Sequence, residues 1–375
     1  MNYLHRTWAE IDISALIHNF NKIKEISNGS KIMAVVKANA YGHSVCDVAP
    51  VLQENGADYF AVSNIDEALQ LRDCNITKPI LILGYTPVSM AKILYDNNIS
   101  QCVYSFEYAK ALSENAVKNK VKIKVHIKLD TGMSRLGFDC RDEHLQGLES
   151  AVLSAKFDGF YLEGIFTHFA SSDRSVDTED EFTNEQFARF TAALNEFEKA
   201  GLKPEFCHSC NSAAIIKDSD KRLDICRPGI ILYGLSPSDS EEFNCGLIPV
   251  MTLKSVVSMV KTVKKGDTLS YGRTFKAEKD MKIATVTAGY ADGYPRLLSN
   301  KAYVLINGQK APLVGRVCMD QLTVDVSDIE NVKMDDEVIL FGKELSVDIL
   351  AEICGTINYE IVCGISPRVP RIIIG

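Results

Sequence analysis

Apolar, strand-like runs alternate with amphipathic helical patterns from the start of the chain to about Gly234. Eight of the apolar runs are candidates for strands, at residues 32–37, 59–63, 79–84, 101–105, 123–130, 162–168, 206–210 and 224–227. Helical patterns separate most of these runs, and eight strands that alternate with helices are typical of a parallel barrel. The pattern therefore predicts an α/β fold with an N-terminal (β/α)8 TIM-like barrel. A doubly wound sheet is the alternative, since periodicity alone cannot close a barrel.

Capping residues indicate where several of the predicted helices begin and end. Asn64 precedes a helical pattern and Glu67 follows three residues later, as in a capping box. Thr183 and Gln186 have the same spacing ahead of another helical pattern. Gly201 is expected to end that second helix.

After residue 246 the pattern changes to short strands separated by turn residues. The predicted strands lie at residues 256–263, 283–288, 303–306, 313–318 and 338–341. Asn307-Gly308 lies between two apolar runs and is a strong signal for a β-hairpin. We therefore predict a C-terminal β-rich domain, with the boundary within residues 236–246. The barrel takes residues 1–240 and the β-rich domain residues 241–375, and we allow the extreme N-terminal strand, at residues 8–13, to pack with the second domain.

Length, composition and charge are those of an ordinary globular protein. The chain has 375 residues, of which 46% are hydrophobic and 24% charged, enough for one large domain and a smaller one. The formal net charge is 41 − 49 = −8, which argues against a nucleic-acid partner. No apolar run has the length of a membrane span, and the first residues lack the pattern of a signal peptide. We expect a cytoplasmic protein with no membrane partner.

The 11 cysteines are odd in number and scattered along the chain. This favours reduced thiols over a disulfide framework. Cys207 and Cys210 have the spacing of metal ligands, but no second pair accompanies them, so we interpret them as buried thiols and predict no metal.

A lysine stands at the end of the first predicted barrel strand, in the stretch KIMAVVKANAYGH. The residues before Lys37 are apolar and those after it, Ala38 to Ala40, are small. An apolar floor disfavours the ammonium form of a lysine, and small neighbours leave room for an aldehyde, so the position suits Schiff-base chemistry. A surface lysine at a strand end is the alternative interpretation.

Polar residues also follow four later strands, where a barrel of this type has its active site. They occur in the stretches KLDTGMSR, TH, NSAA and RPGI, from Lys128, Thr167, Asn211 and Arg227 onward. Asn211 and Ser212 open a helix, and Gly229 permits close backbone approach, which together suit a bound phosphate. A strand-end lysine and a phosphate site imply a phosphorylated aldehyde, of which pyridoxal 5'-phosphate is the obvious one.

Several motifs together resemble those of the alanine racemase family, whose members are fold-type III pyridoxal-phosphate enzymes. They are AVVKANAYGH, HIKLDTGMSRLG, GIFTHFA, CNSAA, RPGIILYG, SYGRTF, GYADGYPR, VGRVCMDQ and INYE, and they occur in order over nearly the whole chain. The resemblance implies an amino-acid racemase that interconverts L-alanine and D-alanine. It also implies a homodimer with shared active sites and a role in supplying D-alanine for peptidoglycan.

The resemblance also implies two proton carriers and a partner for the cofactor ring. Lys37 matches the lysine that binds the cofactor covalently and serves as one general base. Tyr271 matches the opposite base, which reaches the cofactor from the partner subunit. Racemisation needs such a pair, because one group removes the α-proton and another returns a proton to the other face. Arg227 matches the arginine that faces the pyridine nitrogen, and a guanidinium can only donate, so that nitrogen accepts.

The remaining matched residues surround the cofactor and the substrate. Tyr41, Ser212, Gly229, Ile230 and Tyr359 match the phosphate-binding residues, next to Asn211. His168 matches a histidine near the cofactor ring, and Arg135 an arginine near the ring oxygen and the substrate carboxylate. Met319 matches a residue of the partner subunit whose backbone amide binds that carboxylate. Tyr290 and Tyr359 match tyrosines that line the entry corridor.

Lys128 is the subject of a separate hypothesis. In some members of the family the matching lysine is carbamylated, and the resulting anion orients the arginine. Burial lowers the pKa of a lysine and so makes a neutral amine available for reaction with CO₂. We therefore hypothesise that Lys128 is carbamylated.

Three other functions are compatible with parts of this pattern. A serine or broad-specificity racemase differs only in pocket volume and a few polar contacts, although Tyr359 favours an alanine-sized pocket. A non-catalytic pyridoxal-phosphate carrier would lack the β-rich domain. A decarboxylase of the same fold type would carry a glycine-rich phosphate loop, which we do not find.

Overall fold

A computed structural model describes residues 6–174, 181–238, 243 and 245–375. These residues divide into two compact units. We call residues 17–40 and 45–247 the barrel unit, and residues 6–16, 41–44 and 248–375 the β-rich unit. The predicted boundary at residues 236–246 falls partly outside the described residues.

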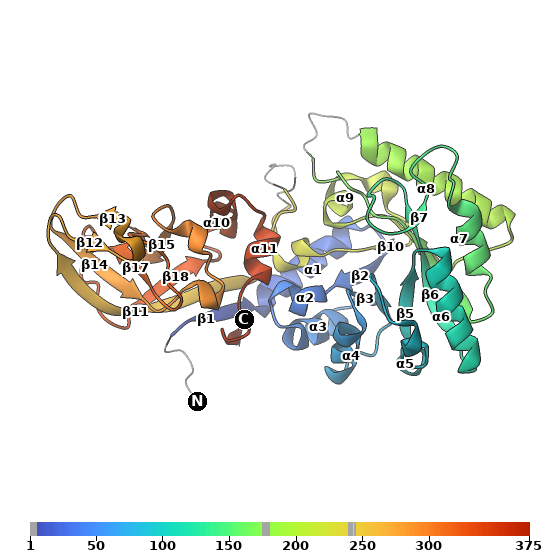
Figure 1. Cartoon of the computed structure of the whole chain (residues 1–375), viewed down its shortest axis with the longest axis horizontal. Helices are drawn as coiled ribbons and strands as arrows, with labels where there is room; N and C mark the ends of the chain where they lie inside the picture. Colours follow the sequence, from blue (N-terminus) through green and yellow to red (C-terminus); the bar gives the residue numbers. More distant parts are fainter. Residues whose placement is uncertain (1–5, 175–180, 239–242, 244) are drawn as a thin grey trace. The chain divides into compact units, whose positions relative to one another are not determined.

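The barrel unit contains a sheet of parallel strands in the order β10-β2-β3-β4-β5-β6-β8-β9 (Figure 1). The strands are β2 (Lys31–Val35), β3 (Tyr59–Val62), β4 (Ile80–Ile82), β5 (Ile99–Val103), β6 (Ile123–Asp130), β8 (Phe160–Phe166), β9 (Phe206–His208) and β10 (Ile225–Cys226), and β7 (Phe138–Asp139) pairs with β6. Backbone hydrogen bonds from Asp224 to Cys207 (3.1 Å) and from Arg227 to Cys210 (3.2 Å) join the two ends of this order. The prediction of a parallel barrel is confirmed.

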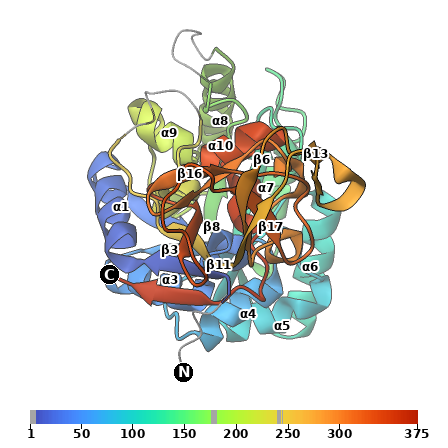
Figure 2. The same ribbon diagram turned by 90° about the vertical axis from the view of Figure 1, so that its left-hand side faces the viewer.

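Helices connect successive strands and lie on the outer side of the barrel, as α4, α5 and α6 show (Figure 1 and Figure 2). The helices are α1 (Ile13–Ile26), α2 (Lys37–Tyr41), α3 (Val45–Glu54), α4 (Ile65–Asp73), α5 (Ala91–Asp96), α6 (Phe106–Lys118), α7 (Leu148–Ala155), α8 (Glu181–Lys199) and α9 (Ser212–Lys217), with short 3-10 turns at Val88–Met90, Ser219–Lys221 and Ile230–Tyr233. Each longer helix buries one apolar face. On α6 this face includes Ala109, Leu112 and Ala116.

Two of the predicted helix starts can be compared with the structure. The Asn64 side chain accepts from the Glu67 amide (3.0 Å), so Asn64 caps α4 as predicted. The capping box at Thr183 and Gln186 is wrong, because α8 begins at Glu181 and both residues are buried inside it. Gln186 instead accepts from the Ala170 amide (2.9 Å) and donates to the His168 carbonyl (3.1 Å). It therefore ties α8 to the segment after β8.

The β-rich unit is built on a mixed sheet in the order β16-β15-β18-β11-β1-β19, and β14 joins β11 to β17. The strands are β1 (Trp8–Asp12), β11 (Met251–Val263), β14 (Met281–Val286), β15 (Tyr303–Ile306), β16 (Gln309–Pro312), β17 (Leu322–Asp325), β18 (Glu337–Phe341) and β19 (Arg371–Ile374), with a separate ribbon of β12 (Thr268–Leu269) and β13 (Phe275–Lys276). The N-terminal strand β1 pairs with β11 and β19. Helices α10 (Val347–Cys354) and α11 (Asn358–Cys363) complete the unit.

The hairpin at Asn307-Gly308 is confirmed. Ile306 pairs with Gln309, and both turn residues have positive φ (51° and 71°), as a type I′ turn requires. The strand predicted at residues 313–318 is wrong. Only Leu313 forms a β-bridge there, because Gly315 turns the chain with φ +86° and the Cys318 amide bonds back to Gln321.

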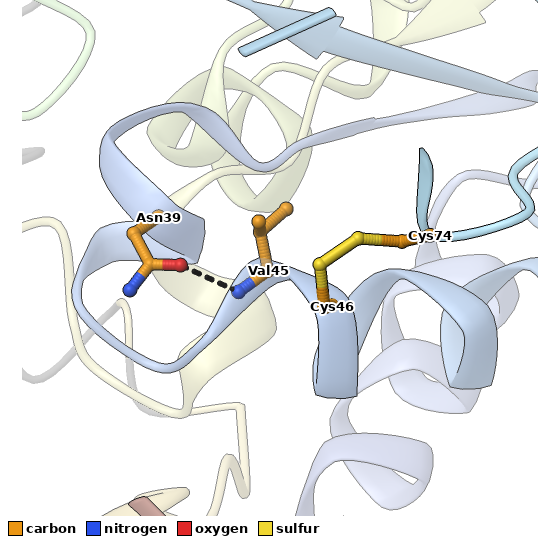
Figure 3. Close-up of a disulfide and its surroundings, with 4 residues drawn as sticks. All are labelled: Asn39, Val45, Cys46 and Cys74. Atoms are coloured by element: carbon orange, nitrogen blue, oxygen red, sulfur yellow. Dashed lines mark hydrogen bonds between the residues drawn. A yellow bond between two sulfur atoms is a disulfide. The ribbon is translucent and has the colours of Figure 1, made fainter. Parts of the chain in front are cut away.

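The expectation that every thiol is reduced is wrong for one pair of cysteines. A disulfide joins Cys46, in the first turn of α3, to Cys74, which ends α4 (Figure 3). The two Cα atoms are 5.3 Å apart although 28 positions separate the residues in sequence. The other nine cysteines, all among the described residues, form no disulfide, so this single bond is not part of a disulfide framework. No helix in the described ranges is long and apolar enough to cross a membrane.

Candidate functional site

Lys37 follows β2 by two residues and opens a turn of unusual backbone conformation. Ala38, Asn39 and Ala40 have φ near +54° and ψ near +49°, which is the left-handed region. Tyr41 also has positive φ (52°). Left-handed conformation costs roughly 1–2 kcal/mol for each non-glycine residue. Such a run persists only where its surroundings determine it, and it is typical of functional sites.

Three hydrogen bonds within the barrel unit hold this left-handed turn. The Ala38 amide donates to one carboxylate oxygen of Glu67 (2.8 Å), whose other oxygen accepts from the Ser63 amide (2.7 Å). The Asn39 side chain accepts from the Val45 amide (2.8 Å), which joins the turn to the start of α3 (Figure 3). The Ala40 amide donates to the Val36 carbonyl (2.9 Å). The lysine is therefore carried by a turn anchored to two helices.

The loop after β6 presents Arg135. Asp130 ends the strand, and one of its carboxylate oxygens accepts from the amides of Gly132 (3.1 Å) and Ser134 (3.0 Å). These bonds fold residues 131–134 into a tight turn, so Arg135 follows at the end of the strand. Its side chain is exposed.

Lys128 is a buried lysine inside β6. It is 6% exposed, and its ammonium group bonds to the Leu129 carbonyl (2.9 Å). Burial lowers the pKa of this amine to about 7, and the charges of Arg227 and Arg135 act in the same direction. A large part of the amine is therefore neutral, and so nucleophilic, near pH 7.

Arg227 lies at the end of β10, buried beside two histidines. Its guanidinium donates to His208 Nδ1 (2.9 Å), to the carbonyls of Thr167 and Ser209 (2.8 Å each) and toward His168 Nδ1 (3.3 Å). Burial holds the pKa of His168 well below its usual value, and the nearby Arg227, Lys128, Arg135 and Lys37 lower it further. His168 is therefore a neutral imidazole.

The ends of β9 and β10 supply hydroxyl and amide donors. Asn211 caps α9 by accepting from the Ala214 amide (3.0 Å), as predicted. The Ser212 hydroxyl oxygen accepts from the Gly229 amide (2.9 Å), so its own hydrogen remains available to an anion. Ile230 starts the following 3-10 turn. The mouth of the barrel thus combines an amine, a guanidinium and hydroxyl donors.

Tyr41 and Tyr359 lie together in the β-rich unit, with ring centroids 6.1 Å apart. Burial raises the pKa of the Tyr41 phenol well above its usual value, and Tyr359 and Cys363 add to this effect, so the group stays protonated and can donate. Gly42, which has φ +84°, is required beside them. A Cβ atom at this position would lie 2.3 Å from the Val362 carbonyl oxygen.

Tyr271 is the most exposed of the predicted site residues in the β-rich unit, at 70%. It follows Ser270, whose φ is +63° and whose hydroxyl donates to the Arg316 carbonyl (2.7 Å). The next residue, Gly272, also has positive φ (71°). This strained turn projects a large aromatic side chain away from the unit's core.

Tyr290 and Met319 are held by a buried carboxylate. Asp292 accepts from Arg6 (2.5 Å), from Arg368 (2.8 Å) and from the Gly289 amide (2.9 Å). The 3-10 turn that carries Tyr290 is bonded to the next segment, because the Tyr290 amide donates to Cys318 and the Ala291 amide to Met319 (3.0 Å each). Tyr290 and Met319 are 43% and 53% exposed. The ion cluster therefore positions both side chains on the unit's surface.

The predicted residues thus form two groups, one in each unit. Sequence reasoning missed the residues that support them, above all Glu67, Asp292 and a buried series formed by Glu163, His126 and His208. The last series had a visible signal, since Glu163, His126 and His208 all fall within predicted barrel strands.

Comparisons with known proteins cover nearly the whole chain. Residues 11–237 match the model of the alanine racemase N-terminal domain, and residues 250–373 match that of the C-terminal domain. An alanine racemase of Clostridium perfringens is 49% identical over 370 residues, which are 97% of this chain and 94% of that protein. The solved alanine racemase of Clostridium difficile 630 is 40% identical with a TM-score of 0.91, covering 98% of this chain and 96% of its own. The solved Bacillus anthracis alanine racemase with bound L-Ala-P is 37% identical with a TM-score of 0.90, covering 100% and 96%.

Proposed function

The chain belongs to the alanine racemase family, and from this premise we propose that it interconverts L-alanine and D-alanine as a cytoplasmic homodimer that supplies D-alanine for peptidoglycan. The observation that carries the proposal is the match to both domain models. It is combined with the position of Lys37 and Arg227, which follow the paired barrel strands β2 and β10. A carrier protein would not need the second domain.

The barrel residues fit pyridoxal 5'-phosphate as the cofactor. When bound, this group withdraws electrons from the substrate α-carbon and so makes its proton removable. Lys37 would hold its aldehyde carbon, and Ser212, Gly229 and Ile230 would face its phosphate, next to Asn211. Tyr41 and Tyr359 are further phosphate-binding residues in the proposal. The donor set supports this fit, because an available hydroxyl hydrogen, amides and a protonated phenol all suit a dianion.

Arg227 would determine which reaction follows proton removal. Burial lowers the pKa of the Arg227 guanidinium to about 10, so it is still protonated near neutral pH. It can only donate, and a ring nitrogen opposite it must accept and stay unprotonated. Such a ring withdraws electrons less strongly than a protonated one. Return of a proton to the substrate is then favoured over transamination or decarboxylation.

We propose that Lys37 and Tyr271 exchange protons with opposite faces of the substrate. Two positioned bases are the simplest way to remove and return a proton with inversion. The high exposure of Tyr271 and Met319 in a single chain supports their use by a partner chain. A closed two-fold dimer would give each site one base from each subunit. In this proposal His168 lies near the ring, Arg135 and Met319 bind the substrate carboxylate, and Tyr290 and Tyr359 line the entry corridor.

Substrate preference is tested by steady-state racemisation of L-alanine and L-serine. We expect kcat/KM for alanine to exceed that for serine by about tenfold or more, because the larger substrate must place a hydroxymethyl group in an alanine-sized pocket. The measurement is the rate of D-enantiomer formation, with purified protein and added pyridoxal phosphate. Faster turnover of serine would favour the serine racemase alternative. A protein that binds the cofactor and racemises neither amino acid would be a carrier.

Lys128 is expected to carry a carbamate beside Arg135. The neutral amine would attack CO₂, forming a nitrogen–carbon bond and releasing a proton, and the resulting anion would pair with the Arg135 guanidinium. Because the pKa of the amine is about 7, the modified fraction should rise as the pH increases through 7. ¹³C-labelled CO₂ should give a carbamate signal in the NMR spectrum, and Lys128→Met should lose that signal together with about tenfold in kcat/KM, as a lost charge-assisted contact costs.

Lys122→Met is the matched control, because Lys122 is exposed just before the same strand. It should keep both the carbamate signal and the rate. An unmodified Lys128 in enzyme saturated with CO₂ would contradict the hypothesis.

A further inference from the structure

A series of buried polar side chains runs through the interior of the barrel from Glu163 to Arg227. We call Glu163, His126, His208 and Arg227 the barrel relay. Glu163 Oε2 lies 3.0 Å from His126 Nε2. His126 Nδ1 lies 2.9 Å from His208 Nε2, and His208 Nδ1 lies 2.9 Å from Arg227 Nη1. All four side chains are at most 3% exposed.

The arginine determines the direction of every hydrogen bond in the barrel relay. Arg227 can only donate, so His208 Nδ1 must accept and His208 must carry its proton on Nε2. That proton is donated to His126, so His126 Nδ1 accepts and its proton lies on Nε2. The His126 proton is in turn donated to Glu163. A cationic His126 is excluded, because its Nδ1 proton would meet the Nε2 proton of His208.

The two ends of the barrel relay are held by different partners. At one end Glu163 pairs with Lys124 (3.1 Å) and accepts from the Ser100 hydroxyl. Burial raises the pKa of Glu163, but the hydrogen bonds from His126 and Ser100 and the charge of Lys124 act against this effect and lower it. Glu163 is therefore an anion near neutral pH. At the other end Arg227 Nη2 donates to the Thr167 and Ser209 carbonyls (2.8 Å each) and lies 3.3 Å from His168 Nδ1.

The packing around the barrel relay is adapted to these rings. The His208 ring stacks on Phe166 with a centroid distance of 4.8 Å and an interplanar angle of 8°. A Cβ atom on Gly164 would lie 2.3 Å from His126 Nδ1, so only glycine leaves room for that ring. Barrel interiors are usually filled by branched apolar residues, and burying a carboxylate and two imidazoles is costly unless each is paired. Because the burial of these polar groups is costly in free energy, the barrel relay indicates a role beyond packing.

We propose that Glu163 is a positioning residue for the racemisation reaction, acting through His126 and His208 to hold Arg227 as a donor toward the cofactor ring. Hydrogen bonds that all point the same way polarise one another. The carboxylate at the far end therefore makes His208 Nδ1 a stronger acceptor and restricts the guanidinium to one orientation. The remaining Nη1 and Nε hydrogens, which have no partner in the part of the chain that the structure describes, are then directed to the ring. This inference rests on the proposed function.

The proton positions are tested independently of activity by ¹⁵N NMR of histidine-labelled holoenzyme. We expect His126 and His208 each to show a protonated Nε2 and an unprotonated Nδ1 at neutral pH. Signals are assigned with His126→Gln and His208→Asn. A protonated Nδ1 on either ring would overturn the proposal even if alanine is racemised. Failure to racemise alanine would refute the proposed function and leave the proton positions intact.

The role of Glu163 is tested by Glu163→Gln, which keeps the size and the acceptor but removes the charge. We expect kcat to fall about tenfold with KM little changed. A loss of this size is typical when a residue that orients a functional group through hydrogen bonds is replaced. We also expect more pyruvate per turnover, because a looser Arg227 allows the ring nitrogen to become protonated. Glu163→Leu, which removes the acceptor as well, should show a larger change in both quantities.

Glu205→Gln makes the same chemical change at an exposed residue just before the adjoining strand β9 and should leave rate and pyruvate yield unchanged. Gly164→Ala should displace the His126 ring without changing any charge and should resemble Glu163→Leu. If the leucine variant does not fold, the glutamine variant and the NMR signals still decide. A Glu163→Gln enzyme with unchanged kcat and pyruvate yield would overturn the proposal.

Discussion

Replacing Lys37 by alanine is expected to abolish racemisation in both directions, by at least about 10³-fold. The substitution removes both the covalent attachment of the cofactor and one of the two bases, and a positioned base alone contributes about 10²–10⁴-fold. The measurement is D-alanine formation from L-alanine and the reverse. The visible absorbance of the protein before and after borohydride provides a second readout. Borohydride should fix the cofactor permanently to the wild-type enzyme, on a peptide that contains Lys37, and should not do so in the variant.

Lys31→Ala is the matched control for this experiment. Lys31 begins the same strand, β2, and its ammonium group forms a loose surface ion pair with Asp58 (3.8 Å). The control should keep its rate and its reducible absorbance. Borohydride labelling of another lysine in the wild-type enzyme would contradict the role of Lys37.

Tyr271→Phe is expected to have the second largest effect, and an asymmetric one. Removing the phenol hydroxyl takes away the base on one face only. Exchange of the α-proton with solvent deuterium should persist for one enantiomer of alanine and fall about 10²–10⁴-fold for the other. Net racemisation should fall to the same extent in both directions, because every turnover needs both faces.

The cofactor absorbance should be unchanged in Tyr271→Phe, since the phenol is not proposed to hold the cofactor. Tyr303→Phe, on strand β15 of the same unit, is the control and should behave like the wild type. Parallel loss of cofactor binding and of both exchange reactions would show that Tyr271 has a structural role instead.

The barrel was predictable because its strands are buried on both faces. The run at residues 59–62 is apolar and buried at every position. Residues 123–130 instead alternate between apolar and polar residues, and β6 (Ile123–Asp130) has the predicted bounds. The β-rich unit was less predictable. Strands β16 and β19 consist largely of exposed or half-buried residues, and their pairing depends on partners remote in sequence. Helices α10 and α11 are not predicted by the sequence pattern. The last element that the pattern predicts is the strand at residues 338–341, which precedes both helices.

For the candidate site, the sequence predicts the groups that carry chemistry but not those that support them. Lys37 and Arg227 stand at strand ends, and that position indicates function. Glu67 was interpreted only as part of a helix cap, although its carboxylate also holds the lysine turn. Cys46 and Cys74 could not be paired from sequence, since a spacing of 28 positions says nothing about distance in space. Supporting residues act through contacts that only the folded chain creates.

The left-handed turn after Lys37 has a consequence for attempts to redesign this enzyme. Its screw sense is opposite to that of an ordinary helix over Ala38 to Ala40, so moving the amine forward by a single position would point it along a different path and would put a long side chain into a strained conformation. A designer who wishes to shift the reactive amine, or to transplant it to another scaffold, would have to graft the turn together with the carboxylate of Glu67 that anchors it. The unit to be transferred is thus the left-handed turn together with the Glu67 carboxylate, and Lys37 is only one part of it.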